Sequence, residues 1–364
     1  MITVELSQHT MGKLWEKLIR SMMFGLDAER AHELGIAALR MGLATPFASG
    51  ETVNFGEIER FGLKFKNPLG MAAGFDKNGI VVNQLASLGF GFVEVGTVTF
   101  DPQPGNPKPR LFRLPGEQAL INRLGFNNDG AAVVAERLKN LDRKCVVGVN
   151  IGKNKIVPNE EATENYLKSF VLVHPVADYV AVNISSPNTP NLRELQKVDN
   201  LEELLRALVS RNHELGRKPL LVKIAPDLSE SEIEMIVYIC LRFEIDGVIA
   251  TNTTISRDCL KTDFAKIGDG GLSGKPLEQR SNEVISSIFK YSKGKLPIIG
   301  VGGIFNADDV FAKIAAGASL IQAYTGFVYG GPTFVRDVTK GLAAILKERG
   351  FEKLDETVGS AVAV

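Results

Sequence analysis

The sequence predicts an α/β protein, a (β/α)8 TIM barrel with an N-terminal helical hairpin. Three observations support this fold. Eight short apolar segments alternate with helix-length segments from about Asn67 onward, which is the pattern of parallel strands joined by helices. The segment before them shows only helical periodicity. The chain has 364 residues, whereas such barrels typically take about 250, so about 100 residues remain for additions to the barrel.

The N-terminal segment begins with an amphipathic helix. Asp27 is suited to cap a second helix, expected over residues 28–41. Two interpretations stay open, because the hairpin can pack on its own domain or can touch lipid or a lipophilic ligand. The apolar face of the first helix consists of Met11, Leu14, Trp15, Leu18, Ile19, Met22 and Met23.

The eight apolar segments have the composition of parallel strands that are buried on both faces. A doubly wound open sheet is the competing arrangement. The predicted strands are residues 69–73, 92–95, 146–150, 179–184, 220–224, 247–251, 298–301 and 320–323. The predicted helices that follow them are residues 79–88, 130–141, 161–171, 201–215, 230–243, 278–291, 307–316 and 333–348.

Two connections, residues 97–128 and 252–277, are much longer than the others. Both follow the carboxyl end of a strand, the face where barrel enzymes build their sites, so we expect them to bind or cover a ligand. The chain beyond residue 350 has weak structure signals and is expected to fray. The predicted organisation is therefore a helical segment over residues 1–45, a barrel over 46–350 and a tail over 351–364.

The composition argues against several classes of protein. Lys+Arg and Asp+Glu both number 42, so the formal net charge is zero and no nucleic-acid-binding surface is expected. The three cysteines show no CxxC spacing and the four histidines no HExxH pair, so neither a disulfide framework nor a metal site is expected. No segment has the pattern of a signal peptide or of a transmembrane helix.

Lys223 ends the fifth predicted strand, in LVKIAP, and should point to the barrel mouth. A buried lysine is costly unless it is paired, which favours a functional role. Lys223 can form a Schiff base, as in aldolase chemistry. It can also stay charged and stabilise an anion such as a reduced flavin ring.

The seventh and eighth strand ends resemble a phosphate-binding corner. GVGGI follows the seventh strand, and Thr325 and Gly326 follow the eighth. Glycines let backbone N–H groups approach phosphate oxygens, and many barrels bind phosphate at this place. The sequence therefore predicts a phosphorylated cofactor or substrate.

A group of asparagines and one serine lie at or near other strand ends. Asparagine is a common turn residue, but several at one face offer paired donors and acceptors that suit a flat ring with amide edges. Ser186 lies in an SSP turn, and no histidine is near a strand end except His174, upstream of the fourth strand. A hydrolase triad is therefore not expected, and Ser186 is either a turn former or a base in a closed pocket. The asparagines are Asn122, Asn150, Asn183, Asn188 and Asn252.

Taken together, these motifs resemble the class 2, quinone-dependent dihydroorotate dehydrogenases over nearly the whole chain. The resemblance implies a (β/α)8 barrel that holds FMN and oxidises dihydroorotate to orotate in pyrimidine biosynthesis. The matching segments are NPLGMAAGFDKNG, EVGTVTFDPQPGNPKPRLFRL, INRLGFNNDG, VGVNIGKNK, VNISSPNTPNLRELQ, LVKIAPDLS, ATNTTISR, GGLSGKPL, PIIGVGGI and QAYTGFVYGGP.

The resemblance also implies roles for residues of this sequence. Ser186 is implied to be the catalytic base that removes the C5 proton, while a hydride leaves C6 for the flavin. The implied substrate-binding residues are Lys77, Asn122, Arg123, Leu124, Gly125, Phe126, Asn183, Asn188, Asn252 and Thr253. The implied FMN-binding residues are Ala73, Gly74, Lys77, Thr97, Asn150, Asn183, Lys223 and Thr251, with the phosphate at Gly274, Gly303, Tyr324 and Thr325.

The resemblance further implies the partners and the location. Class 1 relatives carry Cys where Ser186 stands and lack the N-terminal helices, so both features favour class 2. In that class the helical segment lies on the membrane and forms the tunnel by which a quinone reaches the flavin. A peripheral membrane protein is therefore expected, anchored by residues 1–45, and the absence of a transit peptide favours the cytoplasmic face of a bacterial inner membrane. A Schiff-base lyase using Lys223 is the alternative function.

Overall fold

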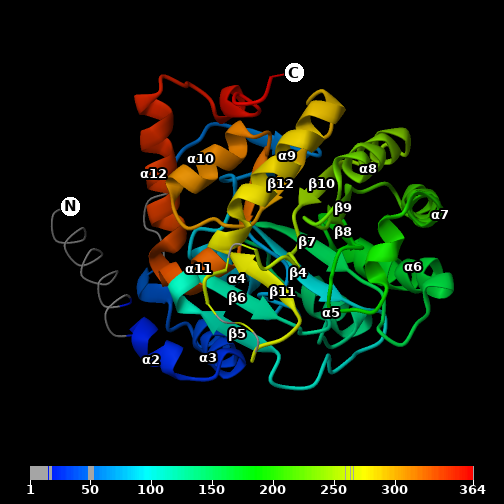
Figure 1. Ribbon diagram of the computed structural model, residues 1–364, viewed down its shortest axis with the longest axis horizontal. Coiled ribbons are helices and arrows are strands. Elements are labelled where there is room, and N and C mark those ends of the chain that lie inside the picture. Colours follow the sequence, from blue (N-terminus) through cyan, green and yellow to red (C-terminus); the bar gives the residue numbers. More distant parts are fainter. Residues whose placement is uncertain are drawn as a thin grey trace.

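The computed structural model describes residues 15, 19–47, 53–258, 260–262, 264 and 266–363. Its centre is a closed barrel of eight parallel strands surrounded by helices (Figure 1). The closure confirms the predicted (β/α)8 barrel and excludes the open sheet. In order around the barrel, the strands are β3 (Leu69–Met71), β4 (Phe92–Val98), β7 (Val146–Ile151), β8 (Tyr179–Asn183), β9 (Leu220–Ile224), β10 (Gly247–Ala250), β12 (Ile298–Val301) and β13 (Leu320–Ala323).

The barrel strands are buried because their side chains face either the barrel interior or the surrounding helices. Every residue of β8, β9 and β10 is buried, as parallel strands covered on both faces require. Asn183 of β8 pairs with Lys223 of β9, so these two predicted site residues lie at the same level. The carboxyl ends of all barrel strands open on one face, which collects the strand-end residues there.

The predicted helices between the strands are confirmed, with ends that shift by at most three residues. Capping boxes fix the starts of two of them, through Ser229 with Glu232 and Asn306 with Asp309. A short helix, α11 (Thr325–Gly330), lies between β13 and α12 and was not predicted. The others are α4 (Val82–Ser87), α5 (Ala131–Lys139), α6 (Ala162–Val173), α7 (Val198–Glu214), α8 (Glu230–Arg242), α9 (Glu278–Ser292), α10 (Ala307–Ala315) and α12 (Phe334–Glu348).

The two long connections contain strands that sequence patterning missed. β5 (Leu111–Leu114) and β6 (Ala119–Asn122) come from the first connection and β11 (Gly271–Gly274) from the second. They form an antiparallel sheet in the order β11-β6-β5, which lies beside the barrel (Figure 1). A further antiparallel pair, β1 (Ile58–Arg60) and β2 (Leu63–Phe65), precedes the barrel. Charged or small residues interrupt most of these strands, so they lack the near-continuous apolar run by which the barrel strands were predicted.

The N-terminal hairpin consists, in its described part, of α2 (Arg20–Gly25) and α3 (Ala28–Arg40), with α3 beside β5 (Figure 1). Asp27 caps α3 as predicted, because its carboxylate accepts the backbone N–H groups of Glu29 and Arg30 at 3.1 and 3.0 Å. The predicted apolar positions Met11, Leu14 and Leu18 lie outside the described residues. No helix in the described part of the chain is both long and apolar enough to span a bilayer.

A buried ion pair fixes the hairpin to the barrel mouth. Arg110 Nη2 lies 2.7 Å from Glu29 Oε1, and both side chains are nearly inaccessible to solvent. Arg110 Nη1 also donates to the carbonyl oxygens of Pro104 and Asn106, at 2.6 and 2.8 Å. One arginine therefore holds α3 against the loop that leads to β5.

The C-terminal tail is packed rather than frayed, which corrects the expectation from its sequence. Leu354 and Thr357 are buried in a short 3₁₀ helix, Leu354–Thr357. The N–H groups of Gly359 and Ala361 donate to the carbonyl oxygens of Ile314 and Ala315. The tail is therefore bonded to the last turn of α10.

Candidate active site

One cavity opens at the carboxyl ends of the barrel strands and is lined in part by residues of the β11-β6-β5 sheet. It encloses about 1060 Å³ of empty space, some of it open to solvent. Most of the residues that the sequence assigned to a site line this cavity. They are Ala73, Gly74, Lys77, Thr97, Asn122, Leu124, Gly125, Phe126, Asn183, Ser186, Asn188, Lys223, Thr251, Asn252, Thr253, Gly274, Gly303, Tyr324 and Thr325.

Two predicted site residues, Arg123 and Asn150, do not line the cavity. Arg123 Nη1 donates to the carbonyl oxygens of Ile267 and Asp269, at 2.6 and 2.8 Å. Arg123 therefore ties the end of β6 to the segment before β11. Asn150 lies behind Thr97, whose hydroxyl donates to Asn150 Oδ1 at 2.6 Å. The direct ligand contacts that the resemblance implies for Arg123 and Asn150 stay predictions.

Ser186 lies in the cavity wall beside two asparagines. Its side chain is buried, with 5% of the residue exposed. The backbone N–H of Asn188 donates to Ser186 Oγ at 3.2 Å, and such a bond stabilises negative charge on the oxygen. Asn188 Nδ2 donates to Asn122 Oδ1 at 3.1 Å. The Ser186 turn is thereby joined to β6, the strand across the cavity.

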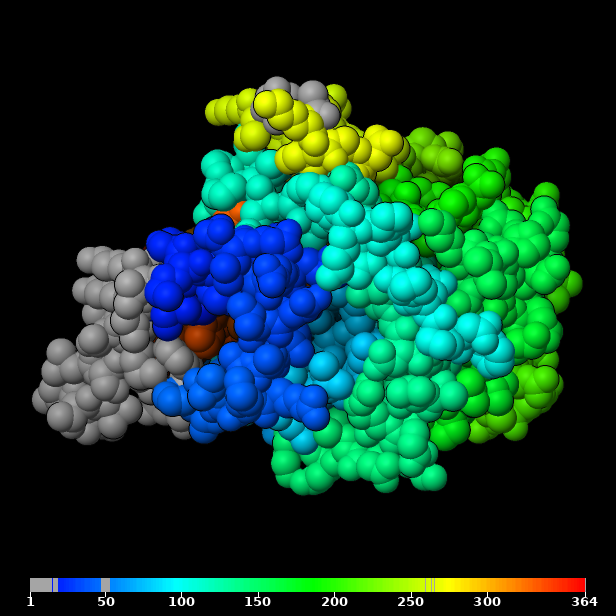
Figure 2. Space-filling view, turned by 90° about the horizontal axis from the view of Figure 1, so that it is seen from below, coloured from blue at the N-terminus to red at the C-terminus, as the bar shows by residue number. Residues whose placement is uncertain are grey.

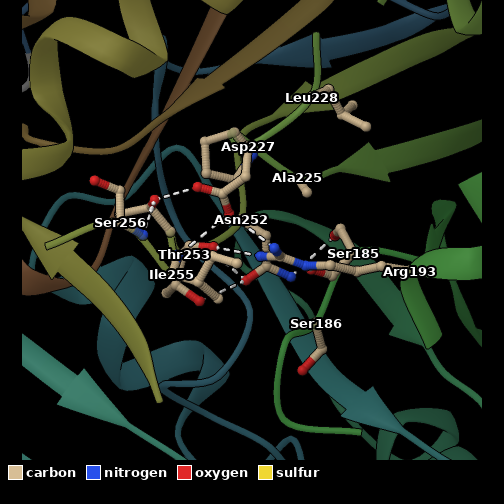
Figure 3. Close-up of polar contacts among 12 residues, drawn as sticks. Ser185, Ser186, Arg193, Ala225, Asp227, Leu228, Asn252, Thr253, Ile255 and Ser256 are labelled. Atoms are coloured by element: carbon tan, nitrogen blue, oxygen red, sulfur yellow. Dashed lines mark hydrogen bonds and ion pairs between the residues drawn. The ribbon is translucent and has the colours of Figure 1, made fainter. Parts of the chain in front are cut away.

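A second polar group joins the ends of β8 and β10. Asn252 Nδ2 donates to Asn183 Oδ1 at 3.2 Å and to Ser185 Oγ at 3.0 Å. Ser185 Oγ in turn donates to Asn183 Oδ1 at 3.0 Å. Ser185, Ser186, Asn252 and Thr253 are neighbours in Figure 3. The amide groups of two strand ends are therefore fixed relative to the serine turn.

A polar cluster fills the barrel interior beneath the cavity. Glu94 is fully buried and accepts hydrogen bonds from Asn150 Nδ2, Tyr179 OH and Gln322 Nε2, at 2.8, 2.9 and 2.7 Å. Lys223 Nζ lies 4.0 Å from Glu94 Oε1. Burial lowers the pKa of Lys223, and the charge of Glu94 opposes that shift. Lys223 is thus a paired cation at the cavity wall.

Sequence reasoning identified Lys223 but missed its partners. Glu94 interrupts the apolar run FVEV, and Gln322 interrupts LIQA. A charged or amide side chain in a strand buried on both faces must find a polar partner inside the barrel. That rule could have linked Glu94 to Lys223, although it could not have given their distance.

Lys77 provides a second positive charge, on the hairpin side of the cavity. Burial lowers the pKa of Lys77 to about 8, while the charge of Glu29 opposes the shift. Burial, together with the charge of Lys77, lowers the pKa of His32 to about 3, so His32 is neutral at pH 7. The His32 ring makes an edge-to-face contact with Phe75, with 5.1 Å between ring centres. Lys77 is therefore the titrating cation of this wall.

Glycines and hydroxyls gather at the end of the cavity near β11, β12 and β13. Gly303 has a φ of +72°, and a Cβ there would lie 2.3 Å from the Cβ of Glu278. Gly274 has a φ of +102°, and its Cβ would lie 2.3 Å from a carbonyl oxygen. Only glycine fits these positions. The hydroxyls of Ser273 and Thr325 are 2.9 Å apart, so this end offers small, polar groups suited to a phosphate.

Comparisons with known proteins agree with this arrangement. A family model described as dihydroorotate dehydrogenase matches residues 57–346. A protein of Gloeobacter violaceus, named dihydroorotate dehydrogenase (quinone), is 50% identical over 351 residues, which cover 95% of this chain and 98% of that protein. A protein of Roseiflexus sp. with the same name is 50% identical over 357 residues, with the same coverage of both chains.

Solved structures show the same likeness in three dimensions. The dihydroorotate dehydrogenase of Eimeria tenella in complex with ferulenol has a TM-score of 0.87 and 39% identity, and the match covers 91% of this chain and 95% of that one. The ligand-free form has a TM-score of 0.86, with 93% and 100% covered. The family is flavin-dependent in general. The chain therefore belongs to the dihydroorotate dehydrogenase family and, within it, to the quinone-dependent class.

Proposed function

We propose that this protein oxidises (S)-dihydroorotate to orotate in pyrimidine (UMP) biosynthesis, with FMN as hydride acceptor and a quinone as final electron acceptor. The observation that carries the proposal is the composition of one cavity wall. A nearly buried serine, Ser186, lies there with amide groups from four asparagines and with the cation Lys77. Amide groups suit the ring amides of the substrate, and Lys77 suits its carboxylate.

The cavity fits a flavin ring. Two buried side-chain oxygens in its wall, Thr251 Oγ1 and Gln322 Oε1, have no hydrogen-bond partner among the described residues. An unpaired buried acceptor is costly, so a ligand with ring N–H groups fits here. FMN, when bound, supplies the ring that accepts a hydride and passes two electrons to a quinone.

Residues of this chain would hold FMN at both of its ends. Lys223 would place positive charge beside the ring, where negative charge develops on reduction. Ser273, Gly274, Gly303 and Thr325 would hold the phosphate. The other proposed contacts with the ring and its chain come from Ala73, Gly74, Lys77, Thr97, Asn183, Thr251 and Tyr324, with Asn150 behind Thr97.

Ser186 would act as the base. Its oxygen would take the proton from substrate C5 as the hydroxyl proton passes to a hydrogen-bonded hydroxyl or water molecule, while a hydride leaves C6 for the flavin and a double bond forms between C5 and C6. A serine hydroxyl is a weak base, so the chain must raise its effectiveness. The N–H of Asn188 supports charge on Ser186 Oγ, and the buried position excludes water.

The substrate ring would be held from both sides of Ser186. Asn122 and Asn188 are already bonded to each other, and Asn252 and Thr253 lie on the β10 side. Backbone and side chains of Leu124, Gly125 and Phe126 close the cavity beside β6. Arg123 would contribute by fixing this stretch to the segment before β11.

The hairpin would bind the membrane and guide the quinone from it to the flavin. α2, α3 and the residues after them expose several large apolar side chains, as a membrane-surface segment does. In Figure 2 the hairpin, in dark blue, lies at the surface, and orange residues near α11 are visible beside it. We place the protein at the cytoplasmic face of a bacterial inner membrane, since the similar proteins described above include bacterial ones. The exposed side chains are Met22, Leu26, Leu34, Met41 and Leu43.

The proposed role of Ser186 is tested with the FMN-loaded protein. Ser186→Ala should bind FMN normally, yet its flavin should be reduced by dihydroorotate at least about 100-fold more slowly, the scale of general base catalysis. Ser319→Ala is the matched control, because Ser319 is also buried but precedes β13 at the opposite end of the barrel. Unchanged flavin reduction in Ser186→Ala would contradict the role.

Borohydride trapping of a keto substrate on Lys223 would favour the alternative, a Schiff-base lyase.

A further inference from the structure

Arg193 joins three strand-end segments around the Ser186 turn. It lies in a short 3₁₀ helix, Leu192–Gln196, that follows the turn. Its Nε donates to the carbonyl oxygen of Ser185 and its Nη2 to that of Thr253, both at 3.0 Å. Its Nη1 donates to Asp227 Oδ2 at 2.8 Å. The guanidinium group therefore contacts the segments after β8, β9 and β10 at once (Figure 3).

Asp227 orients this guanidinium group and extends the connection. Asp227 Oδ2 also accepts the backbone N–H of Ile255 at 3.2 Å, and Oδ1 accepts the hydroxyl of Thr254. The carboxylate thus joins Arg193 to the start of the segment that leads from β10 to β11. The Arg193 and Asp227 side chains are 22% and 19% exposed, which leaves the pair only partly screened by water.

The backbone around Asp227 is itself fixed from α9. Arg280 Nε donates to the carbonyl oxygen of Pro226 at 2.9 Å, and Arg280 Nη2 donates to that of Leu228 at 2.6 Å. Both neighbours of Asp227 are held in this way. The carboxylate that orients Arg193 is therefore attached to the barrel rather than to a free loop.

Arg193 does not contact the Ser186 hydroxyl, which points away from it in Figure 3. Its contact is with the carbonyl group of the peptide that links Ser185 to Ser186. The same guanidinium group holds the peptide carbonyl of Thr253, a proposed substrate contact. A planar fork with fixed angles between its donors sets the distance between these two backbone groups, and a lysine ammonium cannot reproduce it.

We propose that Arg193, oriented by Asp227, is a positioning residue for Ser186. The pair fixes the serine turn against Asn252 and Thr253, so that Ser186 Oγ faces the substrate carbon from which it removes a proton. This inference rests on the proposed function, because it assumes that Ser186 is the base. Small errors in such an alignment are costly, since a displacement of about 1 Å can slow a reaction about 100-fold.

The test uses Arg193→Lys and Asp227→Asn in the FMN-loaded full chain. Flavin reduction by dihydroorotate should slow about 10- to 100-fold in Arg193→Lys, with a smaller loss in Asp227→Asn. FMN content, melting temperature and the rate of flavin reoxidation by a soluble quinone should stay within about twofold or a few degrees of wild type. A purely structural defect would affect both half-reactions, whereas misalignment of Ser186 affects only the reductive one.

Arg217→Lys and Asp246→Asn are the matched controls. Arg217 Nη2 lies 2.9 Å from Asp246 Oδ1, and Asp246 Oδ2 accepts the backbone N–H of Leu220. This pair has the same chemistry but lies where β9 begins, at the end of the barrel opposite the cavity. Both control variants should reduce flavin at the wild-type rate.

A double variant separates this inference from the proposed role of Ser186. If Arg193 acts through Ser186, then Arg193→Lys should slow flavin reduction no further in a Ser186→Ala background. Equal fold losses in both backgrounds would overturn the inference, as would an Arg193→Lys rate within twofold of wild type. A wild-type rate in Ser186→Ala alone would instead overturn the role of Ser186, and the inference with it. Should Arg193→Lys fail to fold, the same comparisons are made with Asp227→Asn.

Discussion

Lys223 and Glu94 form an ion pair inside the barrel, with Lys223 Nζ 4.0 Å from Glu94 Oε1 and both side chains nearly inaccessible to solvent. The partners come from strands on different sides of the barrel, β9 and β4. The pair places a positive charge at the cavity without leaving it uncompensated. It also explains why a charged residue can occupy the middle of β4, which is buried along its whole length.

Removing Glu94 should destabilise the protein strongly. Glu94→Gln leaves Lys223 without its countercharge and leaves one acceptor oxygen for three hydrogen-bond donors that now share two. The free energy of unfolding should therefore fall by about 3–5 kcal/mol. Urea denaturation measures this change. The double variant Glu94→Gln with Lys223→Met should recover part of the loss, because no buried charge remains unpaired. Glu348→Gln, at an exposed position, serves as control, and a loss below about 1 kcal/mol in Glu94→Gln would contradict the account.

Binding of the product orotate should weaken as the pH rises through 8. The pKa of Lys77 is lowered to about 8, so Lys77 is charged below this pH and neutral above it. A charged Lys77 attracts the carboxylate of the ligand, and a neutral one does not. Titration of the flavin spectrum with orotate between pH 7 and 9 gives the dissociation constant. Lys77→Gln should bind orotate more weakly and without this pH dependence. If the dissociation constant of the wild-type protein did not change between pH 7 and 9, the contact would be excluded.

A buried lysine outside the cavity should make stability depend on pH. Lys313 is fully buried on α10, and burial lowers its pKa to about 7. Between pH 7 and the unfolded value near 10.5, the unfolded chain binds this proton and the folded one does not. The contribution of Lys313 to the free energy of unfolding therefore rises with pH across that window. Below pH 7 the buried lysine is charged in the folded protein, and its destabilising effect is greatest there.

Replacing Lys313 should remove that dependence. Lys313→Met should stabilise the protein by about 1–3 kcal/mol at pH 6.5, as replacement of a buried charge by an apolar side chain often does. The gain should shrink toward pH 9. Thermal unfolding at both pH values measures it, with Lys340→Met, outside the core on α12, as control. A gain that grows with pH would contradict the assignment of a depressed pKa.

Breaking the ion pair between hairpin and barrel should impair quinone reduction selectively. Glu29→Gln removes the charge that holds Arg110, so α3 should dock less tightly and the KM for quinone should rise by about tenfold, equivalent to about 1.4 kcal/mol. Loss of the Glu29 charge also lowers the pKa of Lys77 further, so flavin reduction is measured at pH 6.5 with saturating dihydroorotate, where it should stay near the wild-type rate. Glu33→Gln is a suitable control, because Glu33 is exposed and its one ion pair within the described residues is with Lys108. Equal losses in both half-reactions would refute a role confined to the quinone.

Much of the barrel could be predicted because its strands are buried on both faces. Segments such as 220–224 and 298–301 are short apolar runs with clear ends, and the structure reproduces them residue for residue. The β11-β6-β5 sheet could not be predicted in this way. Its strands sit in connections rich in proline and glycine, and β11 reads GLSG, so only pairing with Ala119–Asn122 makes it a strand.

The site was predicted as a set of residues but not as a geometry. Ser186, Lys223 and the asparagines were identified as candidates from their positions at strand ends and from the family resemblance. Contacts between distant segments carry no signature in the sequence. Arg193 and Asp227 are 34 positions apart, and Arg123 turns away from the cavity although its neighbours line it. Such contacts depend on how the loops fold over the barrel.

The most direct test of the account is an anaerobic titration of the FMN-loaded protein with dihydroorotate, followed by addition of a soluble quinone. One equivalent of dihydroorotate per flavin should bleach the flavin absorbance and yield one equivalent of orotate, and the quinone should then restore the absorbance. A flavin that stays oxidised in the presence of excess dihydroorotate, or that dihydroorotate reduces but quinone does not reoxidise, would contradict the account.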